Sequence, residues 1–330
     1  MKYLIAGAGA IGAYIGARMA KAGYDVTLFA RGPHLAAMQA HGVRVQSAGG
    51  GFEVRPKVVG SLEEAGPADV VILGVKAHSL PQLAPHLKHV LGQDTTVVST
   101  QNGIPWWYFQ GIGGAAEGIH LERIDPGGVI SAAIEPRRVV GSIVYFSTEI
   151  VSPGIIEHIE GNRISIGEPD GARSERCRKI AEALVASGLR CPITTHIRQE
   201  IWVKLLGNAS FNPVSALTRA TLVQMARDPD VSSVIRNIMQ EVEAVSQKLG
   251  MELPVSIDQR MAGAEKVGEH KTSMLQDLEA GRPMELEALV GSVVELAERL
   301  QIPTPHLRTV YSCSKLLAQF ATVVFQPAKS

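Results

Sequence analysis

The opening of the chain constrains its fold more than any other stretch. Residues 3–6 form an apolar run short enough to be a buried strand, and a G-x-G-x-x-G pattern over residues 7–12 follows at once. An alanine-rich helical stretch then continues to Lys21, and a second apolar run occupies residues 26–30. This order of strand, glycine turn, helix and strand predicts the first unit of a parallel α/β sheet with a dinucleotide-binding turn.

Each glycine of this pattern has its own expected role. Gly7 permits the tight turn, Gly9 lets a pyrophosphate approach the backbone, and Gly12 lets the helix pack close to the strand. The phosphates would then meet the positive end of the helix. The alternative is a glycine turn without a ligand, because three glycines at this spacing also arise by chance. The residues predicted to hold the dinucleotide here are Gly7, Gly9, Ala10, Ile11 and Gly12.

The residue after the second strand indicates which dinucleotide is bound. An NAD site usually has Asp or Glu at this position to bind the ribose 2′-hydroxyl, whereas this chain has Arg31. A guanidinium can hold a 2′-phosphate through paired hydrogen bonds and can stack on the adenine. Arg31 therefore favours NADP(H), and the alternative is a solvated surface arginine.

Length and composition limit the class of protein. A chain of 330 residues is longer than one core usually organises, so we expect two domains. Lysine plus arginine equals aspartate plus glutamate at 32 each, so no overall charge favours nucleic acid or a membrane surface. The three cysteines form no C-x-x-C pair, which argues against a disulfide scaffold or a metal site and fits a reducing cytoplasm.

The hydropathy pattern agrees with that class. No signal peptide precedes the first strand, and no apolar run approaches the ~20 residues that span a bilayer. We therefore expect a soluble cytoplasmic protein whose partner is a small molecule, with neither nucleic acid nor membrane as a partner.

Two further buried runs end in polar residues. Residues 70–75 are followed by Lys76, and residues 96–100 are followed by Asn102 after one intervening glutamine. Ligands gather at the carboxyl ends of the strands in an open parallel sheet, so both side chains are expected to face the reactive end of the cofactor. The alternatives are a solvated Lys76 and an ordinary Asn-Gly turn.

The rest of the first half predicts peripheral strands and one long loop. Residues 43–46 and 52–55 predict a hairpin, and the glycine-rich residues 110–130 predict a loop or insertion. Three later strand-like runs, joined by two turns, predict an antiparallel meander before an amphipathic helix at residues 174–187. The runs are residues 139–146, 155–159 and 163–166, and the turns are residues 151–154 and 160–162.

From residue 196 the pattern becomes helical. Four stretches have helical spacing: residues 197–206, 232–249, 257–267 and 284–300. We therefore predict an α/β dinucleotide-binding domain over residues 1–195, followed by an all-helical substrate domain over residues 196–330.

One helix of this second domain has a polar stripe. Lys204, Asn208 and Asn212 recur every four residues, which puts an ammonium and two carboxamides on one face. A buried lysine is costly unless a carboxylate or ligand compensates its charge. The alternative is a solvated helix face, which the neighbouring Trp202 and Phe211 argue against.

The candidate carboxylate is Glu285. Pro283 can open a helix, which would put Glu285 in the first turn, where the helix dipole stabilises an anion. The same placement is also ordinary helix design.

Together these motifs resemble the ketopantoate reductases, also called 2-dehydropantoate 2-reductases, over nearly the whole chain. The residues that carry the resemblance are the opening glycine pattern with Arg31, Lys76, Gln101-Asn102-Gly103, Lys204 with Asn208 and Asn212, Ser273-Met274 with Gln276-Asp277, and Glu285 before Gly291. Two features differ from the family pattern. Residues 110–130 are longer than expected, and Glu287 stands where aspartate is usual.

The resemblance implies an NADPH-binding Rossmann domain, a helical domain like that of 6-phosphogluconate dehydrogenase, and a substrate cleft between them. It implies that Lys204 is the general acid and that Glu285 orients both the substrate and the lysine. The implied substrate-binding residues are Asn102, Asn208, Asn212 and Ser273, and the cofactor-binding residues beyond the glycine turn are Arg31, Lys76 and Asn102.

The chemistry of these residues fits a ketone reductase. Hydride delivery to a ketone builds negative charge on its oxygen, which a nearby ammonium can stabilise and protonate. The resemblance implies that ketopantoate becomes pantoate, a precursor of pantothenate and coenzyme A. The alternatives are reduction of another 2-keto acid and a non-catalytic NADPH-binding regulator, which would need neither the lysine nor its carboxylate. The oligomeric state, including whether the chain forms a homodimer, is not predicted.

Overall fold

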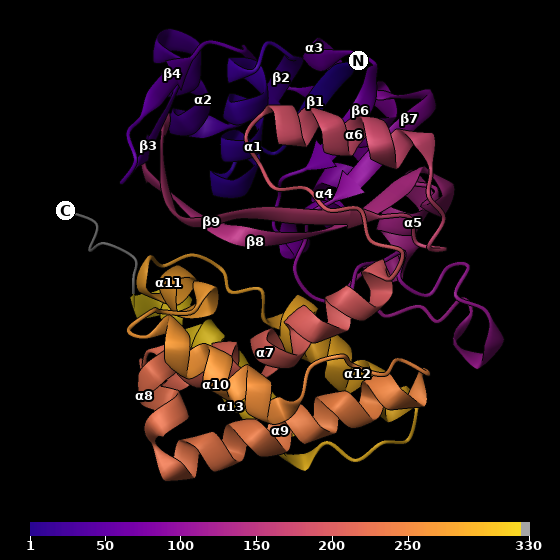
Figure 1. Cartoon of the computed structure of the whole chain (residues 1–330), viewed down its shortest axis with the longest axis vertical. Helices are drawn as coiled ribbons and strands as arrows, with labels where there is room; N and C mark the ends of the chain where they lie inside the picture. The colour runs from indigo at the N-terminus through magenta and orange to yellow at the C-terminus, as the bar shows by residue number, and fades with distance from the viewer. Residues whose placement is uncertain (325–330) are drawn as a thin grey trace. The chain divides into compact units, whose positions relative to one another are not determined.

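The computed structural model describes the backbone of residues 1–324 and the side chains of residues 1–320. The chain divides into two compact units (Figure 1). The first contains Met1–Gln101, Pro105–His120 and Asp125–Ile197, and the second contains Asn102–Ile104, Leu121–Ile124 and the chain from Arg198 onward.

The first unit is built on a mixed sheet of nine strands in the order β4-β3-β9-β8-β7-β6-β1-β2-β5. The strands in chain order are β1 (Lys2–Ala6), β2 (Asp25–Phe29), β3 (Val43–Ser47), β4 (Phe52–Val54), β5 (Lys57–Val59), β6 (Ala68–Leu73), β7 (Leu91–Ser99), β8 (Val139–Ser152) and β9 (Ile155–Gly167). The run from β8 to β5 is parallel throughout. The predicted α/β fold of Rossmann type is therefore confirmed.

The α-helices of the first unit are α1 (Ala10–Lys21), α2 (Gly32–His41), α3 (Leu62–Ala65), α4 (Leu80–Leu83), α5 (Val129–Ala133) and α6 (Glu175–Ala186). The helix α1 contacts β1, β2, β8 and β9, and α6 packs against it. Gly16 of α1 makes this close packing feasible, because a Cβ there would lie 2.4 Å from Leu28 Cδ2 and 2.9 Å from Ile5 Cγ1.

The outer strands follow the prediction only in part. The hairpin of β3 and β4 is confirmed, with Val43 opposite Val54. The meander is wrong, because β8 and β9 are two long antiparallel strands, visible as such in Figure 1. Gly161 lies inside β9 at φ +73°, where the pairing with β8 shifts register. The predicted second turn is thus a bulge that only this left-handed glycine permits.

The second unit is helical in the part of the chain that the structure describes. Its helices are α7 (Ile197–Thr218), α8 (Leu222–Arg227), α9 (Pro229–Lys248), α10 (Ile257–Val267), α11 (Ser273–Glu279), α12 (Ser292–Arg299) and α13 (Pro305–Val324), with a π-helical turn, η6 (Glu287–Gly291), before α12. Across residues 1–324, no helix combines the length and apolar character needed to cross a bilayer.

Candidate active site

The glycine turn has the shape that a dinucleotide requires. Gly7 has φ +107°, and a Cβ there would lie 2.3 Å from Val75 Cγ1. A Cβ on Gly12 would lie 2.2 Å from the carbonyl oxygen of Gly7. Both positions therefore exclude side chains, and the backbone between β1 and α1 is left bare. Gly9 is the N-cap of α1 and has no side chain that could cap the first amides of the helix.

A further glycine completes this turn and was not singled out from the sequence. A Cβ on Gly74, just after β6, would lie 2.3 Å from Gly7 O and 2.9 Å from Gly12 Cα. The Gly74 amide also donates to Ala6 O at 3.1 Å. In the sequence Gly74 interrupts the apolar run of residues 70–75, but its packing role becomes visible only because β6 lies beside β1. Three glycine backbone segments, at Gly7, Gly12 and Gly74, therefore pack closely at the turn where the dinucleotide is predicted to bind.

Arg31 lies at the same edge of the sheet as the glycine turn. It follows β2, and the Ala8 amide donates to Phe29 O at 2.7 Å, which brings the end of β2 beside the turn. Arg31 is exposed and has extended backbone at the N-cap of α2. This placement is the one that the sequence predicts, and it is compatible with either a bound phosphate or solvent.

The ends of β6 and β7 are tied together by Gln101. Its Nε2 donates to Leu73 O at 2.9 Å and to Val75 O at 3.0 Å. Lys76 directly follows this segment and precedes a short 3-10 helix, Ala77–Ser79. Lys76 therefore lies at the carboxyl end of β6, as predicted. Gln101 joins the ends of β6 and β7, a role that the sequence alone does not show.

Two pairs of the predicted polar residues lie close to each other in the helical unit. Asn102 Nδ2 lies 3.4 Å from Glu285 Oε2, and Asn212 Nδ2 lies 3.5 Å from Ser273 Oγ. Both distances are long for hydrogen bonds, so these amides hold their partners weakly. Asn102 belongs to this unit although it directly follows the first-unit segment that ends at Gln101.

The backbone explains how Asn102 reaches the helical unit. Gly103 has φ +87°, and a Cβ there would lie 2.1 Å from the carbonyl oxygen of Ala288. The segment Asn102–Ile104 therefore packs directly on the π-helical turn that follows Glu285. The Asn-Gly pair is a close packing contact here, and a larger residue at position 103 could not occupy this place.

Lys204 is the group most strongly affected by its surroundings. Part of this residue on α7 stays accessible to water, but its ammonium group is buried, and this burial lowers its pKa to about 8. Glu285 raises this pKa and Arg260 lowers it further, but removal from water is the largest effect. The ammonium is therefore mostly protonated at pH 7 yet readily gives up its proton, as a general acid at neutral pH requires.

The predicted position of Glu285 within its helix is wrong. Met284 and Glu285 are not helical, helical structure begins at Leu286, and the π-helical turn begins at Glu287. The Glu285 carbonyl accepts from the Leu289 amide at 3.1 Å, so Glu285 precedes the first turn. A proline can begin a helix, but the sequence does not show that helical structure here begins only at Leu286 and continues as a π-helical turn from Glu287.

Glu287 is held by a cluster that also involves the glycine-rich stretch. Its Oε2 accepts from Arg123 Nη1 at 2.8 Å, and its Oε1 accepts from the Tyr311 hydroxyl at 2.8 Å. Burial, together with the hydrogen bond to Glu287, raises the pKa of Tyr311 to about 12. The backbone amide of Arg123 donates to Glu295 Oε2 at 3.0 Å. Leu121–Ile124 is thus anchored on the helical unit, and Glu287 is engaged in this anchor.

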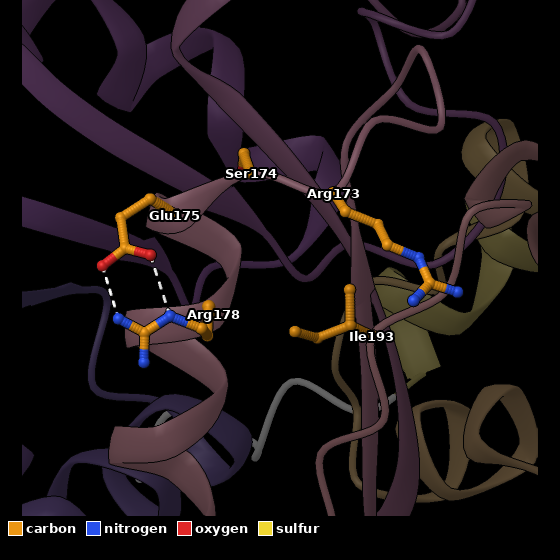
Figure 2. Close-up of a pocket in the computed structure, with 5 residues that line it drawn as sticks. All are labelled: Arg173, Ser174, Glu175, Arg178 and Ile193. Carbon is orange, nitrogen blue, oxygen red and sulfur yellow. Dashed lines mark hydrogen bonds and ion pairs between the residues drawn. The ribbon is translucent and has the colours of Figure 1, made fainter.

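A separate pocket lies in the first unit, at the start of α6 (Figure 2). It is lined by Arg173, Ser174, Glu175, Arg178 and Ile193. Figure 2 shows the Glu175 carboxylate facing the Arg178 guanidinium, with Nε to Oε2 at 2.8 Å. None of the predicted site residues lines this pocket.

The chain matches known proteins over nearly its whole length. The family model "Ketopantoate reductase PanE/ApbA" matches residues 3–171, and "Ketopantoate reductase PanE/ApbA C terminal" matches residues 196–318. A 2-dehydropantoate 2-reductase from Mesorhizobium japonicum is 48% identical over 96% of this chain and 98% of its own. Another from Archaeoglobus fulgidus is 30% identical over 93% and 94%.

Solved structures match the fold over nearly the whole chain. A crystal structure from Ralstonia solanacearum MolK2 has a TM-score of 0.93 and 38% identity, covering 97% of this chain and 98% of its own. A 2-dehydropantoate 2-reductase from Methylococcus capsulatus has a TM-score of 0.83 and 31% identity, covering 98% of each chain. Together with the family models, these matches show that the chain belongs to the ketopantoate reductase family of dinucleotide-binding oxidoreductases.

Proposed function

We propose that this chain catalyses the NADPH-dependent reduction of 2-dehydropantoate to pantoate, a step towards pantothenate and coenzyme A. The observation that carries the proposal is the pKa of Lys204. Burial lowers this pKa to about 8, while the charge of Glu285 raises it. Relatives that are named 2-dehydropantoate 2-reductases and align over nearly the whole chain support this choice of substrate.

Lys204 would act on the oxygen of the substrate ketone. When bound, the reduced nicotinamide supplies a hydride to the ketone carbon. The Lys204 ammonium would hydrogen-bond the ketone oxygen, stabilise the developing negative charge and donate the proton that completes the alcohol. Glu285 would keep the lysine charged and oriented, because a carboxylate near a buried ammonium favours its protonated form.

The remaining polar residues would position the two ligands. We assign substrate binding to Asn102, Asn208, Asn212 and Ser273, and cofactor binding to Gly7, Gly9, Ala10, Ile11, Gly12, Arg31, Lys76 and Asn102. In this proposal residues 1–195 bind the cofactor and residues 196–330 carry the catalytic pair. Asn102 is the exception, since it packs with the helical unit.

NADPH oxidation with ketopantoate, compared with a panel of other 2-keto acids, tests the proposed function. We expect the highest kcat/KM with ketopantoate. A higher value with another 2-keto acid would assign the enzyme to that substrate. NADPH binding without turnover of any 2-keto acid would instead indicate a regulator and overturn the enzymatic proposal.

Arg31→Asp tests the choice of cofactor. The substitution should weaken NADPH binding by ~1 to 3 kcal/mol and affect NADH much less, because only NADPH has the 2′-phosphate that a guanidinium binds and a carboxylate repels. Dissociation constants measured for both cofactors provide the comparison. Arg55→Asp is a suitable control, since Arg55 is another exposed arginine of this unit. An equal loss of affinity for both cofactors would contradict the assignment.

Asn208→Ala and Ser273→Ala test the substrate anchors. Hydrogen bonds made equally in the ground and transition states affect mainly KM, so each change should raise KM about 5- to 20-fold with a smaller effect on kcat. Steady-state kinetics at saturating NADPH would measure both constants. Asn237→Ala in α9 is the matched control and should leave both constants near wild type. An unchanged KM in Asn208→Ala or Ser273→Ala would remove that residue from the substrate site.

We also propose that the reaction takes place in the cytoplasm, where the thiols of Cys177, Cys191 and Cys313 would stay reduced. The enzyme is expected to work without a nucleic acid, a membrane or a metal. Sedimentation of the purified chain would decide whether it forms a homodimer.

A further inference from the structure

A second cation reaches the face of α7 that carries Lys204. A Cβ on Gly207 would lie 2.0 Å from Arg260 Nη2, 3.0 Å from Cζ and 3.3 Å from Nε. The guanidinium of Arg260, from the first turns of α10, therefore occupies the space that a side chain at position 207 would fill. Both residues belong to the helical unit.

The position of Gly207 sets where this cation lies. It follows Lys204 by three residues and directly precedes Asn208, so it lies on the helix face of the polar stripe. A glycine inside a helix is less favourable than alanine because its backbone loses more freedom on folding. Here the missing side chain gives Arg260 direct access to the backbone beside Lys204 and Asn208.

The charges of this cluster favour an anion. Arg260 and Glu285 act on Lys204 with opposite sign, so these three groups together carry two positive charges and one negative charge. Two cations close together repel each other, and an anion that binds near both would relieve this repulsion. A carboxylate matches the flat, two-pronged donor pattern of a guanidinium better than that of an ammonium.

A 2-keto acid presents two oxygen groups to the protein, the ketone and the adjacent carboxylate. If Lys204 donates its proton to the ketone oxygen, a different cation is needed to neutralise the carboxylate one carbon away. We propose that Arg260, seated on Gly207, binds the carboxylate of the 2-keto acid and thereby turns the ketone oxygen towards Lys204. This inference rests on the proposed function, and it selects α-keto acids over neutral ketones as a class.

Arg260→Gln, assayed with a 2-keto acid and with its uncharged methyl ester, tests this role. KM for the acid should rise about 10- to 100-fold, because a charge-assisted contact to the carboxylate is lost. KM for the ester should change less than about threefold, since the ester has no charge to lose. Arg260→Lys should recover part of the affinity for the acid. A residue that only supports the helix packing would instead affect both substrates alike.

Two further variants complete the experiment. Gly207→Ala displaces the guanidinium without changing its charge, so it should reproduce the acid-selective rise in KM even if Arg260→Gln folds poorly. Arg227→Gln is the control, because Arg227 at the end of α8 is exposed and pairs at 2.8 Å with Glu265 of α10, the helix that also carries Arg260. It should leave both substrates unaffected.

The outcomes separate this inference from the proposed function. If the wild-type enzyme reduces 2-keto acids but Arg260→Gln raises KM equally for the acid and the ester, or for neither, then Arg260 does not bind the carboxylate and this inference alone fails. If the wild-type enzyme reduces no 2-keto acid, the proposed function fails and the role of Arg260 fails with it.

Discussion

Lys204→Ala should lower kcat by about 10²- to 10⁴-fold, the usual effect of removing a general acid, while NADPH still binds. In the proposed reaction negative charge develops on the ketone oxygen, and the Lys204 ammonium would both stabilise and protonate it. Single-turnover NADPH oxidation, with a separate NADPH titration, would distinguish chemistry from binding. Lys248→Ala at the exposed end of α9 is the matched control and should keep full activity. A near-normal kcat for Lys204→Ala would show that Lys204 is an ordinary helix residue and not the general acid.

The same prediction extends to Glu285. Glu285→Ala should also lower kcat, because the carboxylate is the charge that keeps the pKa of the buried lysine from falling further. The double variant should lose less activity than the product of the two single effects, since each residue acts through the other. Strictly multiplicative losses would mean that the two residues work independently.

Gly12→Ala should abolish measurable NADPH binding and destabilise the first unit by about 1–3 kcal/mol, which is the usual cost of overpacking. The new Cβ would lie 2.2 Å from Gly7 O and 2.9 Å from Ile5 Cγ2, so the turn itself must move. Thermal unfolding and a fluorescence titration with NADPH would measure both effects. Gly49→Ala is the control, because a Cβ at Gly49 meets nothing within 4 Å. Wild-type NADPH affinity in Gly12→Ala would contradict the cofactor assignment.

The parts of this fold that the sequence predicts correctly are those with local signals. The glycine turn, the buried strands on either side of α1 and the helices α9, α10 and α12 follow from periodicity and from residues that end an element. The helix predicted over residues 197–206 is only the first half of α7, and α8, α11 and α13 were not predicted. The four-residue spacing of Lys204, Asn208 and Asn212 likewise requires only the geometry of one helix, α7.

The parts that sequence analysis missed depend on contacts between distant residues. Arg123 meets Glu287 across 164 positions and Asn102 meets Glu285 across 183, so nothing near either residue indicates its partner. The bulge at Gly161 looks like a turn until β8 is seen to pair on both sides of it. The role of Gly74 also appears only when β6 lies beside β1.

The electrostatics of Lys204 were predicted only in direction. The sequence suggested that a glutamate would restore the charge of a buried lysine, and Glu285 does raise its pKa. Desolvation nevertheless outweighs the carboxylate, and Arg260 adds to the lowering. The balance depends on how deeply the ammonium is buried and on a cation from α10, and neither can be read from the stretch around Lys204.

The pH dependence of kcat/KM tests whether Lys204 is the proton donor, because this ratio reports the ionisation of groups in the free enzyme. Lys204 must be protonated to act as the acid, and burial lowers its pKa to about 8. We therefore expect a plateau in kcat/KM below pH 8 and a tenfold fall for each pH unit above it, with this fall absent from the residual activity of Lys204→Ala. A profile that stays level through pH 9.5, or that rises with pH, would contradict the assignment of Lys204 as the proton donor.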